Sequence, residues 1–246
     1  MTPATSTGKK GSSLVERLEF RRLFNASVIQ TYPGFYQIDA DAQTTSITVA
    51  VDQNAETFSL DGATYPNVQH IVINGNDAGD TITVNSNDEW GYIGCVVNGG
   101  AGNDTISLNE LAGVIHGGGG QNSLTLRDSW YGEVYGDVGS GSIYVIGDSF
   151  AAQVVAGTGN TLIDASQSNY GLYIYGGAGS DTVYGSAYDD QISGGGGTDY
   201  LYGLGGNDTF FSTGGVVVGS SNGTNVAYVP TGMYVSCYNT QFVYSY

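Results

Sequence analysis

Apolar and polar residues alternate in short runs along most of the chain, and each run is bounded by glycines or small polar residues. Ile106 and Leu108 flank one polar residue, and Leu124 and Leu126 do the same. A period of two places the apolar side chains on one face of an extended strand. Because such a short strand cannot bury its apolar face alone, the pattern predicts strands that stack on neighbouring copies of themselves.

The alternating runs recur in units of near-equal length from residue 99 onward. Each unit contains two turns and two short strands, and the units span residues 99–116, 117–135, 136–155, 156–175, 176–193 and 194–211. Stacked units of this kind form a coil in which every unit is one rung. The sequence therefore predicts an all-β fold, a right-handed parallel β-roll or β-helix solenoid with β-strand caps at both ends.

The segments on either side of the repeats predict different roles. Residues 39–73 alternate like strands and predict an N-terminal β cap on a roll that spans residues 74–211. Residues 212–246 predict a C-terminal β cap, which covers a sheet edge that would otherwise aggregate. Five of the six Lys and Arg residues lie within residues 1–22. Residues 1–38 are therefore predicted to be a basic leader that is disordered or forms a short helix.

The rest of the chain is strongly acidic. Of the 23 Asp and Glu residues, 21 follow residue 22, and the net charge of the whole chain is −17. A surface this negative repels phosphate backbones and attracts divalent cations, so nucleic acid is not expected as a partner. No apolar run approaches the roughly 18 residues of a membrane helix, so no membrane span is expected.

Four glycine-rich segments share one pattern. Residues 99–106, 176–183, 194–201 and 203–210 each place an Asp after a glycine-rich run and two residues before an apolar residue. They resemble the G-G-x-G-x-D-x-U-x repeat of hemolysin-type calcium-binding (RTX) proteins. The resemblance implies a β-roll in which calcium is held between turns stacked on one edge. It also implies a secreted bacterial protein, extracellular or at the cell surface, whose repeat domain has a structural or adhesion role.

The predicted calcium ligands follow from the spacing of the turns. Calcium takes six to eight oxygen ligands, mainly carboxylates and carbonyls. Neighbouring turns on one edge are two nonapeptides apart, so ligands are expected 18 residues apart, as Asp181 and Asp199 are on one edge and Asp190 and Asp208 on the other. Glycines let the backbone direct its carbonyls inward. The remaining predicted metal ligands are Asp104 and the glycines Gly176, Gly179, Gly194, Gly197, Gly203 and Gly206.

Toward the N-terminus the ligand pattern decays. Asn122 follows Asp104 by 18 residues, and Gly141 and Asn160 are expected at the next two positions. Weaker calcium binding is expected there, because an Asn side chain carries no charge. The alternative is that Asn122 and Asn160 only close their turns through hydrogen bonds to nearby backbone groups.

Large apolar side chains recur at one point on the other edge of the rungs. When each rung is aligned on its last apolar residue, a column forms from Leu111, Trp130, Phe150, Tyr170 and Tyr188, with Gly206 in the last rung. Rungs lie about 4.8 Å apart, so these rings can touch. The column is either a hydrophobic seam or an aromatic strip for sugar rings. The second interpretation makes the protein a polysaccharide-binding or polysaccharide-modifying β-helix.

No catalytic residues are predicted. The sequence lacks an H-E-x-x-H motif, which a zinc metalloprotease requires. Adjacent carboxylates such as Asp189 and Asp190 point to opposite faces of a strand, so they do not form an acid and base pair. The sequence therefore predicts a non-enzymatic domain that binds calcium.

Overall fold

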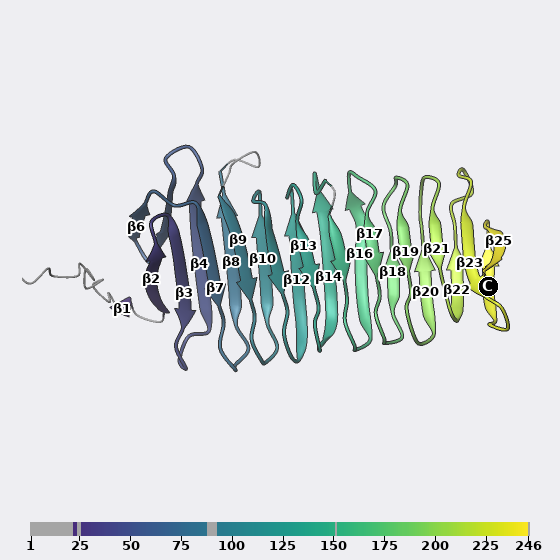
Figure 1. The fold of residues 1–246 in the computed structure, drawn as a ribbon, viewed down its shortest axis with the longest axis horizontal. Helices are drawn as coiled ribbons and strands as arrows, with labels where there is room; N and C mark the ends of the chain where they lie inside the picture. The colour runs from purple at the N-terminus through teal and green to yellow at the C-terminus, as the bar shows by residue number, and fades with distance from the viewer. Residues whose placement is uncertain (1–21, 24–25, 88–92, 151, 246) are drawn as a thin grey trace, which may run out of the picture.

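The structure, a computed structural model, describes residues 22–23, 26–87, 93–150 and 152–245. The chain winds as a coil between one 13-stranded sheet and one 12-stranded sheet (Figure 1). From β7 onward, neighbouring strands in both sheets are parallel, and no helix occurs in the described part of the chain. The predicted all-β parallel solenoid is therefore confirmed. Of the predicted leader, residues 1–21, 24 and 25 lie outside the described residues.

The strands divide between the two sheets almost alternately. The 13-stranded sheet contains, in spatial order, β1 (Arg22–Leu23), β2 (Ala26–Tyr32), β3 (Phe35–Ala40), β7 (His70–Asn74), β9 (Gly94–Asn98), β11 (Gly113–His116), β13 (Glu133–Tyr135), β15 (Gln153–Val155), β17 (Tyr173–Tyr175), β19 (Gln191–Ser193), β21 (Thr209–Phe211), β23 (Val226–Pro230) and β25 (Gln241–Ser245). The 12-stranded sheet contains β24 (Val235–Tyr238), β22 (Gly215–Val218), β20 (Asp199–Tyr202), β18 (Thr182–Tyr184), β16 (Thr161–Ser168), β14 (Ser140–Gly147), β12 (Gln121–Arg127), β10 (Thr105–Asn109), β8 (Thr81–Ser86), β4 (Ser46–Asp52), β5 (Thr57–Leu60) and β6 (Ala63–Pro66).

The core is a narrow apolar column between the two sheets. Each rung contributes inward side chains from both sheets, and parallel register stacks them on their counterparts in the next rung. The principal members of the column are at most 3% exposed: Ile73, Val97, Ile115, Val134, Val154, Ile174, Ile192 and Phe210 from one sheet, and Ile82, Ile106, Leu124, Ile143, Ile163, Val183, Leu201 and Val217 from the other. Polar side chains therefore enter the interior mainly at the two edges, where the chain turns.

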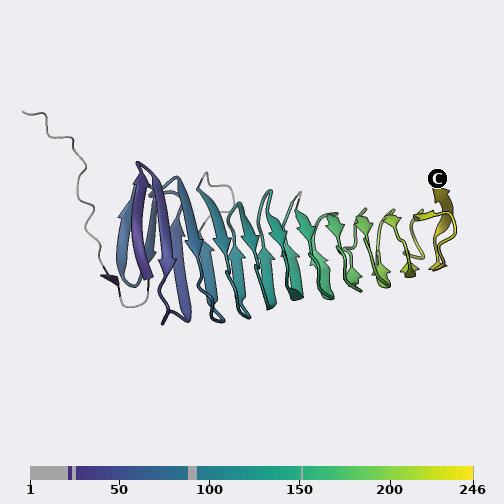
Figure 2. The ribbon, with the colours of Figure 1, turned by 60° about the horizontal axis from the view of Figure 1, so that its bottom comes forward.

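The rungs become narrower toward the C-terminus (Figure 2). In the 12-stranded sheet, β16 has 8 residues whereas β18 has 3. This change coincides with the point at which glycine-rich turns begin to occupy both edges of the rung. The C-terminal rungs consequently bury less apolar surface per rung, and more of their interior is formed by turns.

The ends of the solenoid differ from the predicted boundaries. Strands β2 and β3 form an antiparallel hairpin over residues 26–40, which includes much of the segment 1–38 predicted as leader. The hairpin forms because Tyr36 and Ile38 alternate into the core and Gly34 supplies a turn with φ +82°. At the other end, residues 212–246 continue the parallel rungs through β24 and β25, so the predicted C-terminal cap is built in the same way as the repeats.

Candidate calcium sites

The two edges of the solenoid carry different columns of side chains. We call the turns that lead from the 13-stranded to the 12-stranded sheet the first edge, and the return turns the second edge. On the first edge, strand register aligns Asp80, Asp104, Asn122, Gly141, Thr161, Asp181, Asp199 and Gly215. On the second edge, register aligns Gly132, Ala152, Leu172, Asp190, Asp208 and Asn225. At these aligned positions, the rungs from residue 176 to 211 carry carboxylates on both edges.

The four predicted carboxylates of these rungs lie in the expected pairs. The backbone N–H of Asp181 donates to Oδ1 of Asp199 at 2.9 Å on the first edge. On the second edge, the N–H of Asp190 donates to Oδ1 of Asp208 at 3.1 Å. All four side chains point inward and are at most 3% exposed. Spacing by 18 residues therefore brings each pair onto adjacent rungs, as the sequence predicts.

One oxygen of most of these carboxylates has no protein partner. The buried Oδ2 atoms of Asp104, Asp181, Asp199 and Asp208 accept no hydrogen bond within the described part of the chain. Asp190 differs, because its Oδ2 accepts from the N–H of Ser186 at 2.6 Å and from its hydroxyl at 3.2 Å. Leaving a charged oxygen buried without a partner is costly, and a bound cation removes that cost.

Burial raises the pKa of these carboxyl groups. Desolvation raises the pKa of Asp181 to about 6 and that of Asp208 to about 7, although each accepts a backbone hydrogen bond that acts in the opposite direction. Desolvation also raises the pKa of Asp190 to about 6, with a smaller contribution from the charge of Asp189. The pKa values of Asp104 and Asp199 are raised for the same main reason. The turns are thus poorly suited to hold bare carboxylates at neutral pH.

The predicted glycines leave room around the carboxylates. A Cβ atom at Gly176 would lie 2.7 Å from Oδ2 of Asp181, and side chains at Gly194 and Gly203 would collide with Asp199 and Asp208. Three others have a different constraint: Gly197 and Gly206 adopt positive φ angles, and a side chain at Gly179 would strike the backbone of the preceding rung. The glycines therefore create a small space beside each Oδ2 atom.

Asn122 shows which backbone groups face that space. Its Nδ2 donates to the carbonyl of Gly117 at 2.9 Å and to that of Gly119 at 3.2 Å. Asn225 is arranged similarly, since its Nδ2 donates to the carbonyl of Ser220 at 2.8 Å and to that of Asn239 at 3.1 Å. Carbonyl groups thus converge on the side chain at the sixth position of the repeat, the position of Asp in the G-G-x-G-x-D-x-U-x pattern. An amide closes the turn by itself, whereas a carboxylate at the same position faces those carbonyls with an acceptor.

Two details of the edge columns were not predicted. Thr161, rather than Asn160, occupies the sixth position of its rung, because Thr161 stands two residues before the inward Ile163, as Asp104 stands before Ile106. Counting back from the strand would have located it. Asn160 is at the fifth position, where its Oδ1 accepts the N–H of Ser180 in the next rung at 2.8 Å. Asn103 and Asp189 form equivalent bonds to Gln121 and Asn207.

The predicted aromatic column exists on the second edge. Ring centroids of Trp130 and Phe150 lie 5.0 Å apart with planes at 39°, and those of Phe150 and Tyr170 lie 5.2 Å apart at 81°. Leu111 is fully buried, whereas Tyr188 is 50% exposed. Phe150 and Tyr170 thus pack edge against face and Trp130 is tilted against Phe150, so the three rings do not form one flat strip.

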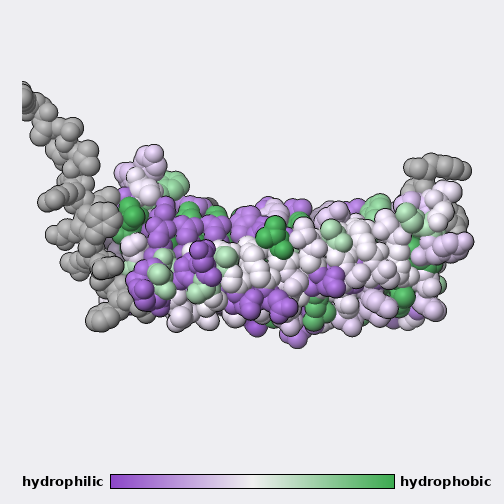
Figure 3. Space-filling view, turned by 90° about the horizontal axis from the view of Figure 1, so that it is seen from below, coloured by the Kyte–Doolittle hydropathy of each residue, from purple (hydrophilic) through white to green (hydrophobic). Residues whose placement is uncertain are grey.

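Oxygen atoms of the turns fit a hard cation such as calcium. No three His, Cys, Asp or Glu side chains converge among the described residues, so ligands beyond the paired carboxylates would be backbone carbonyls. Figure 3 looks onto the first edge, whose C-terminal half is mostly pale, as expected for glycine-rich turns with buried carboxylates. The fold and its edges define a β-solenoid with Gly and Asp turns.

Comparison with known families supports this class. Four copies of the RTX calcium-binding nonapeptide repeat match the chain, at residues 96–110 and 175–210. RTX nonapeptide repeats bind Ca²⁺, and the matches together with the β-solenoid fit a hemolysin-type β-roll protein. Repeat domains of this kind are typically structural rather than catalytic. Searches of curated proteins and of solved structures returned no match. Within the described residues, no helix is long and apolar enough to cross a membrane.

Proposed function

We infer that residues 176–211 form the calcium-dependent part of an extracellular repeat domain with a structural or adhesion role. The observation that carries this proposal is the set of buried, partnerless Oδ2 atoms in Asp181, Asp199 and Asp208, each beside a glycine in a turn. Asp104 has the same arrangement and extends the proposal to a separate rung, residues 99–116, nearer the N-terminus. The paired carboxylates and the turn glycines are the proposed ligand groups.

The chain's own residues give the site its dependence on a cation. Oδ1 of Asp181, Asp199 and Asp208 already accepts an N–H of the preceding rung, which leaves Oδ2 as the atom available for a metal. Bound calcium would neutralise this oxygen and satisfy the turn carbonyls. The described residues from 176 to 211 contain no Lys or Arg that could take its place.

An extracellular setting agrees with such sites. Extracellular calcium modules typically bind with Kd values of about 10⁻⁴ to 10⁻³ M. A rung that calcium stabilises opens more readily at the far lower calcium level of a cytosol and becomes more ordered after export. The structural or adhesion role rests on the solenoid geometry, which presents two long sheet faces without requiring catalysis.

A second candidate is polysaccharide binding through the aromatic column. The observation that favours polysaccharide binding is that the aromatic rings of Trp130, Phe150 and Tyr170 gather on one edge. Because the rings are inclined to each other and pack against one another, the column is better suited to sealing an edge that lacks calcium turns. A glycan array with Trp130→Ala and Tyr170→Ala separates the two roles, since saturable binding lost in both variants would assign the column to sugars.

Calcium titration of the full chain tests the main proposal. Isothermal titration calorimetry should show saturable calcium binding, and circular dichroism should show a gain of β structure over the same concentration range. Asp181→Ala should remove binding, whereas the exposed Asp148→Ala should not. Calcium binding without any change in structure, or binding insensitive to Asp181→Ala, would contradict the proposal.

A further inference from the structure

Aromatic side chains on the outer faces of the sheets stack from rung to rung. On the 13-stranded sheet, the ring centroids of Phe211 and Tyr228 lie 5.2 Å apart with planes at 14°. Tyr184 and Tyr202 stack on the other sheet at 5.0 Å and 13°. Where aligned residues of consecutive rungs are both aromatic, parallel register therefore stacks their rings about one rung spacing apart.

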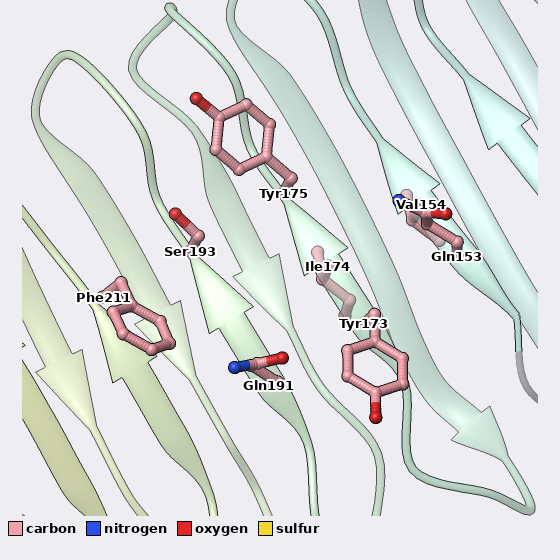
Figure 4. Close-up of a pocket in the computed structure, with 8 residues that line it drawn as sticks. All are labelled: Gln153, Val154, Tyr173, Ile174, Tyr175, Gln191, Ser193 and Phe211. Carbon is pink, nitrogen blue, oxygen red and sulfur yellow. The ribbon is translucent and has the colours of Figure 1, made fainter.

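One rung breaks this column and leaves a gap. Register aligns Tyr175, Ser193 and Phe211, so that a small side chain stands between two rings (Figure 4). Tyr175 and Phe211 are two rungs apart, which corresponds to about 10 Å at sheet spacing. A flat six-membered ring placed over Ser193 would be about one rung from each aromatic neighbour. The gap thus has the dimension of one missing ring.

The gap belongs to a hollow in the sheet surface. The hollow has a volume of about 280 Å³ and extends over β15, β17, β19 and β21. Val154 and Ile174 line it although their side chains are 0% and 3% exposed, so its floor there is formed by backbone. Tyr175 and Phe211 remain 47% and 39% exposed, which leaves ring surface available to a ligand.

Uncharged polar groups border the same hollow. Gln153, Tyr173 and Gln191 form the adjacent column, one per rung. These three side chains form no hydrogen bond to any other residue in the described part of the chain, so their amides and hydroxyl are available. The hollow has no charged residue in its lining, although the chain carries a net charge of −17. Its chemistry therefore suits a neutral ligand rich in hydroxyl groups.

We propose that this hollow binds a neutral polysaccharide, with one pyranose ring seated over Ser193 between Tyr175 and Phe211. A pyranose ring has apolar C–H faces and an equatorial rim of hydroxyls, which match the two aromatic rings and the amide of Gln191 on the same strand as Ser193. Gln153 lies two rungs away, where its amide would face a neighbouring unit of the sugar chain. The open hollow runs across several strands, so a sugar chain enters and leaves along the solenoid axis. This site is separate from the aromatic column on the second edge.

Other occupants fit the groups less well. A planar aromatic molecule would fill the gap but leave the amides and the hydroxyl of Tyr173 unused. A second copy of the chain would bring more negative charge onto a chain that is already strongly acidic. Binding of a planar aromatic molecule and self-association of the chain are therefore the alternative outcomes of a binding test.

Titration with neutral hexasaccharides tests the proposal. The probes are β-1,4-glucan, β-1,4-mannan and β-1,3-glucan hexamers, with hexasialic acid as an anionic comparison, all at saturating calcium. At least one neutral hexamer should bind more tightly than hexasialic acid. Ser193→Tyr, which completes the aromatic column, should weaken that binding at least tenfold. Tyr175→Ala should weaken it by about 3- to 10-fold, the loss expected for one aromatic stacking contact.

A matched control uses a tyrosine on the opposite sheet. Tyr200 is also 47% exposed, and Tyr200→Ala should leave the affinity unchanged. Calcium stoichiometry and circular dichroism of every variant show whether the rungs are intact, so failure of the sugar site is distinguished from failure of the calcium sites. The proposal is overturned if no neutral hexamer binds the calcium-loaded protein, or if Ser193→Tyr leaves binding intact. If no hexamer binds and Ser193→Tyr abolishes self-association, the occupant of the hollow is a second copy of the chain. If no hexamer binds and Ser193→Tyr abolishes binding of a planar aromatic probe, the occupant is a planar aromatic molecule. Either result overturns the proposal.

Discussion

Replacing Asp199 by Asn should change stability in opposite directions with and without calcium. Asp199 has a buried Oδ2 that accepts no hydrogen bond within the described part of the chain, and desolvation raises its pKa. Asn122 shows that an amide at this position donates to two turn carbonyls. The equivalent carbonyls beside residue 199 belong to Gly194 and Gly196. Asp199→Asn should therefore stabilise the calcium-free rung and weaken calcium binding at the same time.

The size of both effects can be worked from the contacts. Two new hydrogen bonds contribute about 1 kcal/mol each, so the calcium-free rung should gain about 2 kcal/mol. Oδ1 of the Asn can still accept the N–H of Asp181. With calcium at a thousandfold excess over Kd, loss of one site removes about 4.1 kcal/mol. The variant should then be less stable than the parent by about 2 kcal/mol.

Hydrogen exchange is the suitable assay, because a solenoid opens locally rather than as one unit. The free energy of opening is measured for residues 176–211 in chelator and in calcium. Asp189→Asn is the matched control: it removes the same charge from an exposed position and keeps the acceptor for the N–H of Asn207. It should change neither value by more than about 0.5 kcal/mol. Destabilisation by Asp199→Asn in both conditions would refute the reasoning.

Three further outcomes are expected. In chelator, lowering the pH from 7.5 to 5 should raise the urea midpoint. The pKa is raised to about 6 for Asp181 and to about 7 for Asp208, from an ordinary value of 3.8. Because the folded state therefore takes up protons that the unfolded state does not, its stability rises as the pH falls through this range. An unchanged midpoint would contradict this. Chelation should reduce hydrogen-exchange protection in residues 176–211 more than in 117–175, and equal loss in both segments would contradict it. Asp104→Ala should weaken calcium binding, measured by calorimetry, less than Asp199→Ala. The neighbour to which the N–H of Asp104 donates is the uncharged Asn122, whereas Asp199 is paired with the carboxylate of Asp181.

The repeat pattern was sufficient to predict the fold and the paired carboxylates. Parallel stacking follows from units of near-constant length, because one unit fills one rung. The 18-residue spacing then fixes Asp181 beside Asp199 and Asp190 beside Asp208, whatever the side-chain details. Local periodicity alone therefore determined both the architecture and the residues that face each other across rungs.

Other features depend on contacts that periodicity does not encode. The middle units lengthen to accommodate longer strands, which shifted the sixth position of one rung from Asn160 to Thr161. The hairpin of β2 and β3 requires Tyr36 and Ile38 to pack on the first rung, which a segment that follows a basic stretch does not reveal. The hollow over Ser193 arises only when register places it between two rings on adjacent rungs.

The two ladders of edge hydrogen bonds run in opposite directions, and this explains how calcium sites can share a solenoid with rungs that lack them. At the sixth position, a side chain accepts the N–H of the preceding rung, as Asp181 does from Thr161 at 2.8 Å. At the fifth position, a side chain accepts from the following rung, as Asn160 does from Ser180. An uncharged Asn and a charged Asp thus tie a rung to its neighbour through the same kind of bond. A carboxylate at the sixth position keeps the ladder intact through Oδ1 and adds a requirement for a cation through Oδ2, so calcium dependence can be confined to the rungs that carry it.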